Sequence, residues 1–148
     1  MPTEARRPDL AAMLAPLLRE LIAAELPVLR AHDLSMWGYT VLIALDESPV
    51  RTQAALAESI GADKTRIIPT LDELQTKGYI ERRADPDDRR VRLLAITESG
   101  RKVKRSVQVG IQRGEERWLS VLSAEERRVL LRALQKMTRV RDSPRVEE

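Results

Sequence analysis

The sequence predicts a mainly α-helical protein with one small β-hairpin. Apolar residues recur at helical spacing over most of the chain, and strand-like runs near 80–84 and 90–96 flank a turn rich in Asp and Pro. The 148 residues include no Phe, so we expect a core of Leu, Ile, Val and Ala, which suits helices. This length allows one domain, or a small domain with a dimerisation element.

Composition excludes several kinds of site. The chain has no Cys, which excludes disulfides, zinc–thiolate sites and thiol redox sensing, and its single His disfavours a multi-histidine metal site. We therefore expect no metal and no cofactor. No apolar run approaches the roughly 20 residues of a membrane span, and the first residues lack a signal-peptide apolar region. A soluble, cytoplasmic protein without membrane association follows.

The first helix is predicted from Asp9 to about Ala31, with a bend near Pro27. Its broad apolar stripe has no obvious partner within a small domain, and such a stripe is typical of an oligomer interface. We assign residues 9–32 to an N-terminal dimerisation helix. The stripe consists of Leu10, Met13, Leu14, Leu17, Leu18, Leu21 and Ile22.

Two shorter helices follow. Ser35 is placed to cap a helix that runs to Leu45, and the chain then turns at residues 46–49. Thr52 caps the next helix, and Gly61 ends it, because glycine accepts the left-handed conformation after a helix. The core positions assigned to the first of these helices are Trp37, Val41, Leu42 and Leu45.

Asp63 is the predicted N-cap of a fourth helix that runs to about Lys77 and stops at Gly78. Pro69 lies inside it and removes the amide that would bond the Thr65 carbonyl. We therefore expect either a slight bend in the helix or a Thr65 carbonyl that bonds water instead. The predicted buried stripe is Ile67, Ile68, Leu71 and Leu74.

After the hairpin, Thr97 caps a long fifth helix, and the Ser-Ala-Glu-Glu run from Ser123 forms a capping box for a sixth. Gly110 and Gly114 either permit close helix packing or are merely tolerated. We assign residues 99–141 to C-terminal dimerisation helices.

The order helix, turn, helix, hairpin within residues 33–98 is that of a winged helix-turn-helix, which we assign as a DNA-binding domain. The first turn of its second helix faces base edges. Arg can bind guanine bidentately, Lys can bind guanine or a phosphate, and Thr can bond a base or touch a thymine methyl. The candidate residues are Asp63, Lys64, Thr65 and Arg66, with Thr70 one turn further on.

The hairpin loop reads Asp-Pro-Asp-Asp-Arg-Arg and ends in Arg89 and Arg90. An arginine at a hairpin tip can enter the narrow minor groove of A·T-rich DNA, and Asp88 has the spacing to hold the Arg90 guanidinium. A plain acidic turn with an exposed ion pair remains open. The wider basic cluster also permits a solvated face, but we favour phosphate contact. Its members are Arg82, Arg83, Arg89, Arg90, Arg92, Arg101, Lys102, Lys104 and Arg105.

Three stretches resemble the MarR family of multiple-antibiotic-resistance-type regulators: IGADKTRIIPTLDELQTKGYI, the wing DPDDRRVRLLAIT and the following TESGRKV. The likeness covers roughly residues 9–140. It implies a homodimer whose first, fifth and sixth helices intertwine, and two lobes that read a pseudo-palindromic operator in double-stranded DNA. Carried over, the minor-groove arginine falls on Arg90, its orienting acid on Asp88, and the base-reading turn on residues 63–66.

The resemblance also implies a small aromatic or anionic effector bound between the dimer helices and the DNA lobe. The candidate pocket residues are His32, Met36, Trp37 and Tyr39. In the alternative interpretation, Trp37 packs in the core and His32 caps the first helix.

The expected function is a sequence-specific DNA-binding transcriptional regulator, a repressor released by a small-molecule ligand. The alternative is a winged-helix protein-interaction module without specific DNA binding. An enzyme lacks support, because the sequence has no glycine-rich phosphate loop and no clustered metal ligands.

Overall fold

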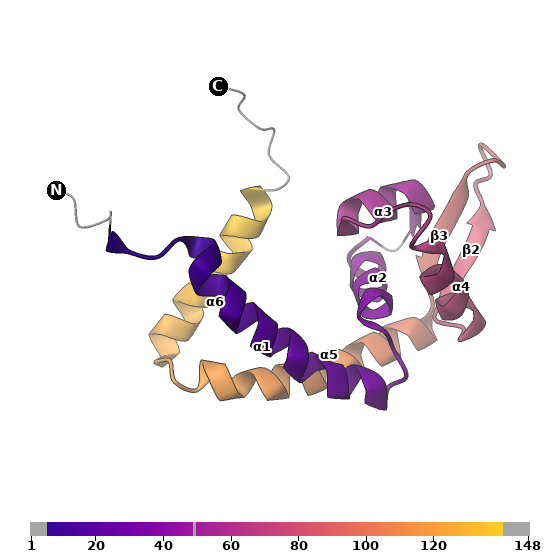
Figure 1. The fold of residues 1–148 in the computed structure, drawn as a ribbon. Helices are drawn as coiled ribbons and strands as arrows, with labels where there is room; N and C mark the ends of the chain where they lie inside the picture. The colour runs from indigo at the N-terminus through magenta and orange to yellow at the C-terminus, as the bar shows by residue number, and fades with distance from the viewer. Residues whose placement is uncertain (1–5, 49, 141–148) are drawn as a thin grey trace, which may run out of the picture. The chain divides into compact units, whose positions relative to one another are not determined.

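The computed structural model of the chain describes residues 6–48 and 50–140 (Figure 1). Described residues up to Gln112 form one compact unit and those from Arg113 onward form another, with one helix running from the first into the second. The elements are α1 (Leu10–Ala31), α2 (Met36–Glu47), β1 (Val50–Thr52), α3 (Gln53–Ile60), α4 (Ile68–Thr76), β2 (Ile80–Ala84), β3 (Arg92–Ile96), α5 (Glu98–Leu119) and α6 (Ala124–Arg139). The predicted class, mainly α with a β-hairpin, is confirmed. Two predicted boundary positions, Pro49 and residue 141, lie outside the described residues.

The predicted helix caps form as hydrogen bonds. The Ser35 hydroxyl accepts from the Gly38 amide at 2.9 Å, and the Thr52 hydroxyl accepts from the Ala55 amide at 3.1 Å. At the start of α6, Ser123 and the residue three positions on complete the predicted capping box. Gly61 follows α3 at a φ of 68°, a conformation that glycine adopts without strain.

The hairpin is part of a three-stranded antiparallel sheet of order β1-β3-β2. Strand β1 was not predicted. Its three residues are too few for an alternation pattern, and the residue that ends it, Thr52, also caps α3. Strand β1 exists because Val50 lies opposite Ala95 on β3, a partner that local pattern does not reveal.

The core of the first unit is aliphatic, as predicted, and its largest fully buried side chains are Leu29, Val41, Leu42, Leu45, Leu56, Leu71, Leu74, Ile80, Leu94 and Val107. Two assignments to the buried stripes were wrong, since Trp37 is 49% exposed and Ile68 is 39% exposed. Each lies one residue, about 100° of helix rotation, from a buried neighbour that takes the core-facing position. Those neighbours are Gly38 and Ile67.

The start of α5 is joined to the turn between α4 and β2 by Thr97. Its amide donates to the Tyr79 carbonyl at 3.0 Å, and its hydroxyl donates to the Gly78 carbonyl at 2.6 Å. The same hydroxyl accepts from the Gly100 amide at 3.0 Å, which caps α5 as predicted. A Cβ on Gly100 would fall on the Tyr79 carbonyl oxygen and lie 2.9 Å from Ile96 Cγ1. Only glycine fits this approach.

The two glycines of α5 differ. A Cβ on Gly110 would lie 2.7 Å from Cγ1 of Val28 on α1, whereas a Cβ on Gly114 would meet nothing within 4 Å. Close packing therefore explains Gly110, and Gly114 is tolerated.

Helices α1 and α6 expose apolar faces. On α1 only Leu29 is buried, and none of the residues of α6 is buried. An exposed apolar helix face is typical of an interaction site. The exposed apolar side chains are Leu10, Met13, Leu14, Leu17, Leu18, Ile22 and Leu26 on α1, and Val129, Leu130, Leu131, Leu134 and Met137 on α6.

Substitution of Gly100 by alanine tests the α5 junction. We expect Gly100→Ala to lower the free energy of unfolding by about 1–3 kcal/mol, because the added methyl overlaps a backbone carbonyl that cannot rotate away. Gly114→Ala, on the same helix with open space around it, is the matched control and should raise stability by about 0.5–1 kcal/mol. Urea unfolding at one fixed protein concentration measures both, and equal effects would contradict the packing described here.

Candidate nucleic-acid interface

The segment before α4 is a separate turn rather than the first turn of a longer helix. The predicted N-cap, Asp63, was wrong: α4 begins at Ile68, and the position before it is Ile67. The cause is Pro69, which has no amide to donate to the Thr65 carbonyl. Near a helix start that missing donor is tolerated, so the regular helix begins beside the proline and not four residues earlier.

Asp63 nevertheless organises the turn. One of its carboxylate oxygens, Oδ1, accepts from the Thr65 amide at 2.8 Å and from the Thr65 hydroxyl at 2.6 Å. The side-chain hydrogen bond from Thr65, followed by the backbone one, lowers the pKa of Asp63 below its ordinary value. The Ile67 amide donates to the Asp63 carbonyl at 3.1 Å, and the Ile67 side chain is buried.

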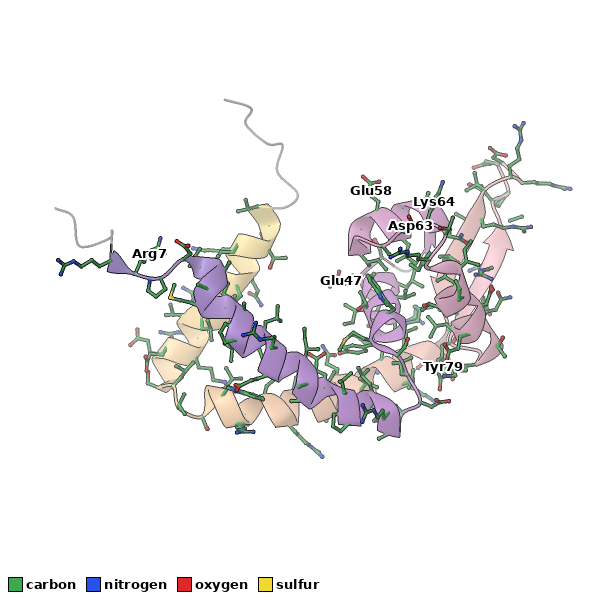
Figure 2. The ribbon with its side chains drawn as sticks, viewed as in Figure 1. Arg7, Glu47, Glu58, Asp63, Lys64 and Tyr79 are labelled. Atoms are coloured by element: carbon green, nitrogen blue, oxygen red, sulfur yellow. The ribbon has the colours of Figure 1, made fainter. Side chains whose placement is uncertain are left out.

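The turn directs polar side chains outward. Lys64, Thr65 and Arg66 are exposed, and Thr70 is half-buried on the first turn of α4. Figure 2 shows Asp63 and Lys64 together between α3 and the hairpin, with the Lys64 side chain extending away from the ribbon.

The wing, residues 85–91, is a tight turn that presents two arginines. The Val91 amide donates to the Asp88 carbonyl at 2.9 Å, which leaves Arg89 and Arg90 at the centre of the turn. Asp88 Oδ1 accepts from the Arg90 amide at 3.1 Å and lies 3.9 Å from Arg90 Nε. The Arg90 side chain is 96% exposed. The predicted pairing of these two residues is therefore present, with the guanidinium free to reach outward.

The structure brings Lys64 and Arg90 to one place, although they come from different elements. Both line a cavity of about 280 Å³ together with the start of α3. A neighbouring cavity of about 430 Å³ shares two of its lining residues, Gln53 and Arg92. Gln53 was not among the predicted site residues. The only local signal for it is its position directly after the Thr52 cap.

The predicted basic cluster divides into two groups. Arg82 of β2 bonds Asp72 Oδ1 at 2.5 Å and Gln75 Oε1 at 3.2 Å, both on α4, and is only 20% exposed. On α5, Arg101 and Lys104 pair with Asp46 at 3.6 and 3.0 Å. These cations hold elements of the lobe together.

The second group consists of exposed cations that form no ion pair with any residue in the described ranges: Arg89 and Arg92 of the cluster, together with Lys64 and Arg66 of the turn before α4. Arg105 does not belong to it, because it pairs with Glu98 at 3.5 Å. Because an unpaired exposed cation keeps its charge available for an external anion, this second group defines the candidate interface.

The predicted effector residues differ in how far they are exposed. His32 is the C-cap of α1, and its Nδ1 donates to the Val28 carbonyl at 2.8 Å. Trp37 is exposed, Met36 is half-buried and Tyr39 is buried. None of them lines either cavity described above. The alternative interpretation is therefore confirmed for His32 as a cap and wrong for Trp37 as a core residue.

The joint between α1 and α2 is tied to the end of α4 by Lys77. Its Nζ contacts the Asp33 main-chain oxygen, and lies 3.3 Å from Asp33 Oδ2 and 3.0 Å from Glu73 Oε1. Desolvation lowers the pKa of Lys77, but the hydrogen bonds to Glu73 and Asp33 outweigh it and raise the pKa overall. Asp33 adopts a positive φ of 50° at this joint.

No group of three or more His, Cys, Asp or Glu residues is placed to hold a metal ion within residues 6–48 and 50–140. Over those same ranges, no helix has the length and apolar character needed to cross a membrane.

Comparison with known proteins places this lobe in a family. The MarR family profile matches residues 34–91. The chain is 30% identical to the transcriptional regulator HosA of Escherichia coli O111:H- over 106 residues, which are 71% of this chain and 78% of HosA. Matches to curated relatives span between 58% and 78% of the relatives' own lengths.

Several solved structures share the fold at 25% identity or more. The transcriptional repressor CouR, bound to a 23-mer DNA duplex, is 26% identical with a TM-score of 0.76, covering 88% of this chain and 93% of CouR. The PcaV regulator of Streptomyces coelicolor, in complex with its natural ligand, is 28% identical with a TM-score of 0.64, covering 89% and 96%. With the HosA match and the shared fold together, the chain belongs to the MarR family of transcriptional regulators.

Proposed function

We propose that this protein is a homodimeric repressor that binds duplex DNA in a sequence-specific way and is released by a small aromatic or anionic effector. It acts in the cytoplasm, by binding and not by catalysis. The observation that carries the proposal is the convergence of two exposed cations from separate elements, Lys64 and Arg90, on one surface, where Arg90 has only a long contact with Asp88 at 3.9 Å. The DNA duplex held by CouR supports it.

In the proposed complex, the turn at residues 64–66 faces base edges in the major groove and the wing lies in the adjacent minor groove. Arg66 is exposed and unpaired within the described residues, so it is free to bind guanine O6 and N7. Arg90 enters the minor groove, where the negative potential is strongest in narrow A·T-rich stretches. Asp88 limits the range of Arg90 conformations through its contact at 3.9 Å.

The exposed apolar faces of α1 and α6 support the homodimer. A second copy of the same chain supplies an equivalent apolar surface, so a two-fold assembly buries both faces at once. The ligand complex of PcaV supports an effector. We place the effector at the joint of α1 and α2, beside exposed Trp37. A molecule bound there lies close to the ion pair between Asp33 and Lys77 and can disturb it.

Sedimentation in dilute buffer tests the assembly. We expect a species of about twice the 16.8 kDa chain mass, since the apolar faces of α1 and α6 are exposed in one chain. On DNA, the two half-sites should lie one helical turn apart, roughly 34–36 Å, because the dimer imposes its symmetry on the operator. A monomer at micromolar concentration would contradict the proposed architecture.

Two arginine substitutions separate the DNA-contacting elements. Arg66→Ala should relax base preference at one position per half-site, with a loss of about 1–3 kcal/mol for a bidentate contact. Arg90→Ala should weaken binding most on sites with A·T-rich flanks. The matched control is Arg105→Ala, which removes the same charge from an arginine already paired with Glu98.

Sequences selected from random duplex DNA, followed by affinity measured against salt concentration, provide the readout. A salt-dependent affinity separates a DNA-binding regulator from the alternative, a protein-interaction module. If both variants bind the selected sequence as tightly as the parent does, the assignment of these two elements is wrong.

Tryptophan fluorescence tests the effector. Aromatic acids should quench the parent protein, and Trp37→Leu should lose this response while Trp118 still emits. The same compounds should weaken DNA binding in proportion to their affinity, because coupling between two sites is reciprocal. Quenching that persists in Trp37→Leu, or that leaves the DNA affinity unchanged, would place regulation elsewhere.

A further inference from the structure

We propose that Thr65 determines base preference as a hydrogen-bond acceptor, and that Asp63 is the positioning residue that makes it one. This inference rests on the proposed DNA-binding function. Asp63, which the sequence suggests as a base-contacting residue, would then act through Thr65 and not touch a base itself.

The Thr65 hydroxyl carries a single proton. Thr65 Oγ1 lies 2.6 Å from Asp63 Oδ1, and an ionised carboxylate can only accept hydrogen bonds. The hydroxyl must therefore donate in this contact. Its proton is occupied, and what it can still offer to DNA is its lone pairs and its methyl group.

The turn holds this arrangement in place. The same carboxylate oxygen also accepts from the Thr65 amide at 2.8 Å, so the side chain of Asp63 and the backbone of Thr65 are fixed relative to each other. The buried Ile67 anchors the other end of the turn, and its amide closes on the Asp63 carbonyl at 3.1 Å. Pro69 keeps the turn distinct from α4, so Thr65 is not drawn into a regular helix where Asp63 would serve only as a cap.

The surroundings place Thr65 where bases would be. It lies between Lys64 and Arg66, which are both exposed, and Lys64 lines the same cavity as Arg90. A short side chain between two long cations reaches a base edge only on close approach. Its hydrogen-bonding character then decides which bases are accepted.

A hydroxyl restricted to accepting discriminates among major-groove edges. Adenine N6 and cytosine N4 carry amino donors that it can bind, and the thymine methyl can pack against its own methyl. Guanine presents only the acceptors O6 and N7 in that groove. A guanine facing Thr65 therefore places its own lone pairs against those of the hydroxyl oxygen, and it is disfavoured.

The negative charge of Asp63 makes the proposal distinguishable from a general effect on affinity. Removing this carboxylate lowers repulsion of phosphates, so any loss of Asp63 should strengthen binding to all sequences about equally. Loss of the Asp63 acceptor also leaves the Thr65 hydroxyl free to donate to a base. This second effect changes the tolerance for guanine at one position per half-site only.

The experiment is selection from random duplex DNA with the full-length protein, comparing the parent with four variants. We expect the parent to disfavour guanine about tenfold at one position per half-site, the size of one hydrogen bond. Thr65→Ser keeps the hydroxyl and should keep this exclusion, whereas Thr65→Val removes the hydroxyl and should abolish it. Asp63→Asn keeps an acceptor oxygen and should keep the exclusion of guanine. Asp63→Ala leaves the Thr65 hydroxyl free to donate and should admit guanine.

Asp85→Ala is the matched control for charge and turn capping. Asp85 Oδ1 accepts from the Asp87 amide at 2.9 Å and makes no contact with a threonine hydroxyl. Because Asp85 lies in the wing, its loss changes overall affinity, but it should leave the relative preference against guanine at the Thr65 position unchanged. Circular dichroism and thermal unfolding of each variant report folding independently.

Guanine exclusion that survives in Thr65→Val, or an Asp63→Ala profile identical to that of the parent, would overturn the inference while leaving DNA binding intact. If the parent enriches no sequence at all, the proposed function itself fails and the inference fails with it.

Discussion

The geometry of the DNA-binding lobe depends on the contacts that Thr97 makes with the backbone of Gly78 and Tyr79. At this point the chain leaves α4, enters β2, returns along β3 and begins α5. The hairpin is therefore closed at its base by the Thr97 hydrogen bonds at 2.6 and 3.0 Å, next to the Ile80 and Ile96 pair of the ladder. Because α4 ends and the hairpin begins at this junction, these contacts fix the base of the hairpin relative to the end of α4.

Arginine performs two different tasks within the same hairpin, and burial separates them. Arg82 is only 20% exposed and is held by Asp72 and Gln75, so it fixes the root of the wing against α4. Arg90 is 96% exposed and has only a long contact with Asp88. The Arg82 side chain is held in one position by its partners, whereas the Arg90 side chain can still change conformation. A basic cluster in a sequence can therefore contain both structural arginines and arginines available for binding, and only the partners of each member distinguish the two kinds.

Sequence reasoning succeeded where the determining interactions are local. The caps at Ser35, Thr52 and Ser123 each involve residues within three positions, and all were predicted. Strand β1 was missed because its partner is on β3, and the start of α4 was misplaced because the effect of Pro69 was treated as a slight bend.

The candidate interface could be predicted in large part because its residues lie in two short runs, the turn after Asp63 and the wing. Gln53 could not, because only the fold brings the start of α3 to the cavity that Lys64 and Arg90 line. The structural role of Arg82 was equally invisible, since its partner Asp72 is ten positions away on another element.

The small sheet has a consequence for the behaviour of the chain at high concentration. Its edges are β1, with only three residues, and β2, whose sequence Ile-Glu-Arg-Arg-Ala places charges along the strand. Short and charged edges are poor templates for pairing with a strand of another molecule. The apolar strand β3 lies between them and is shielded on both sides, so the lobe resists edge-to-edge aggregation when the protein is concentrated.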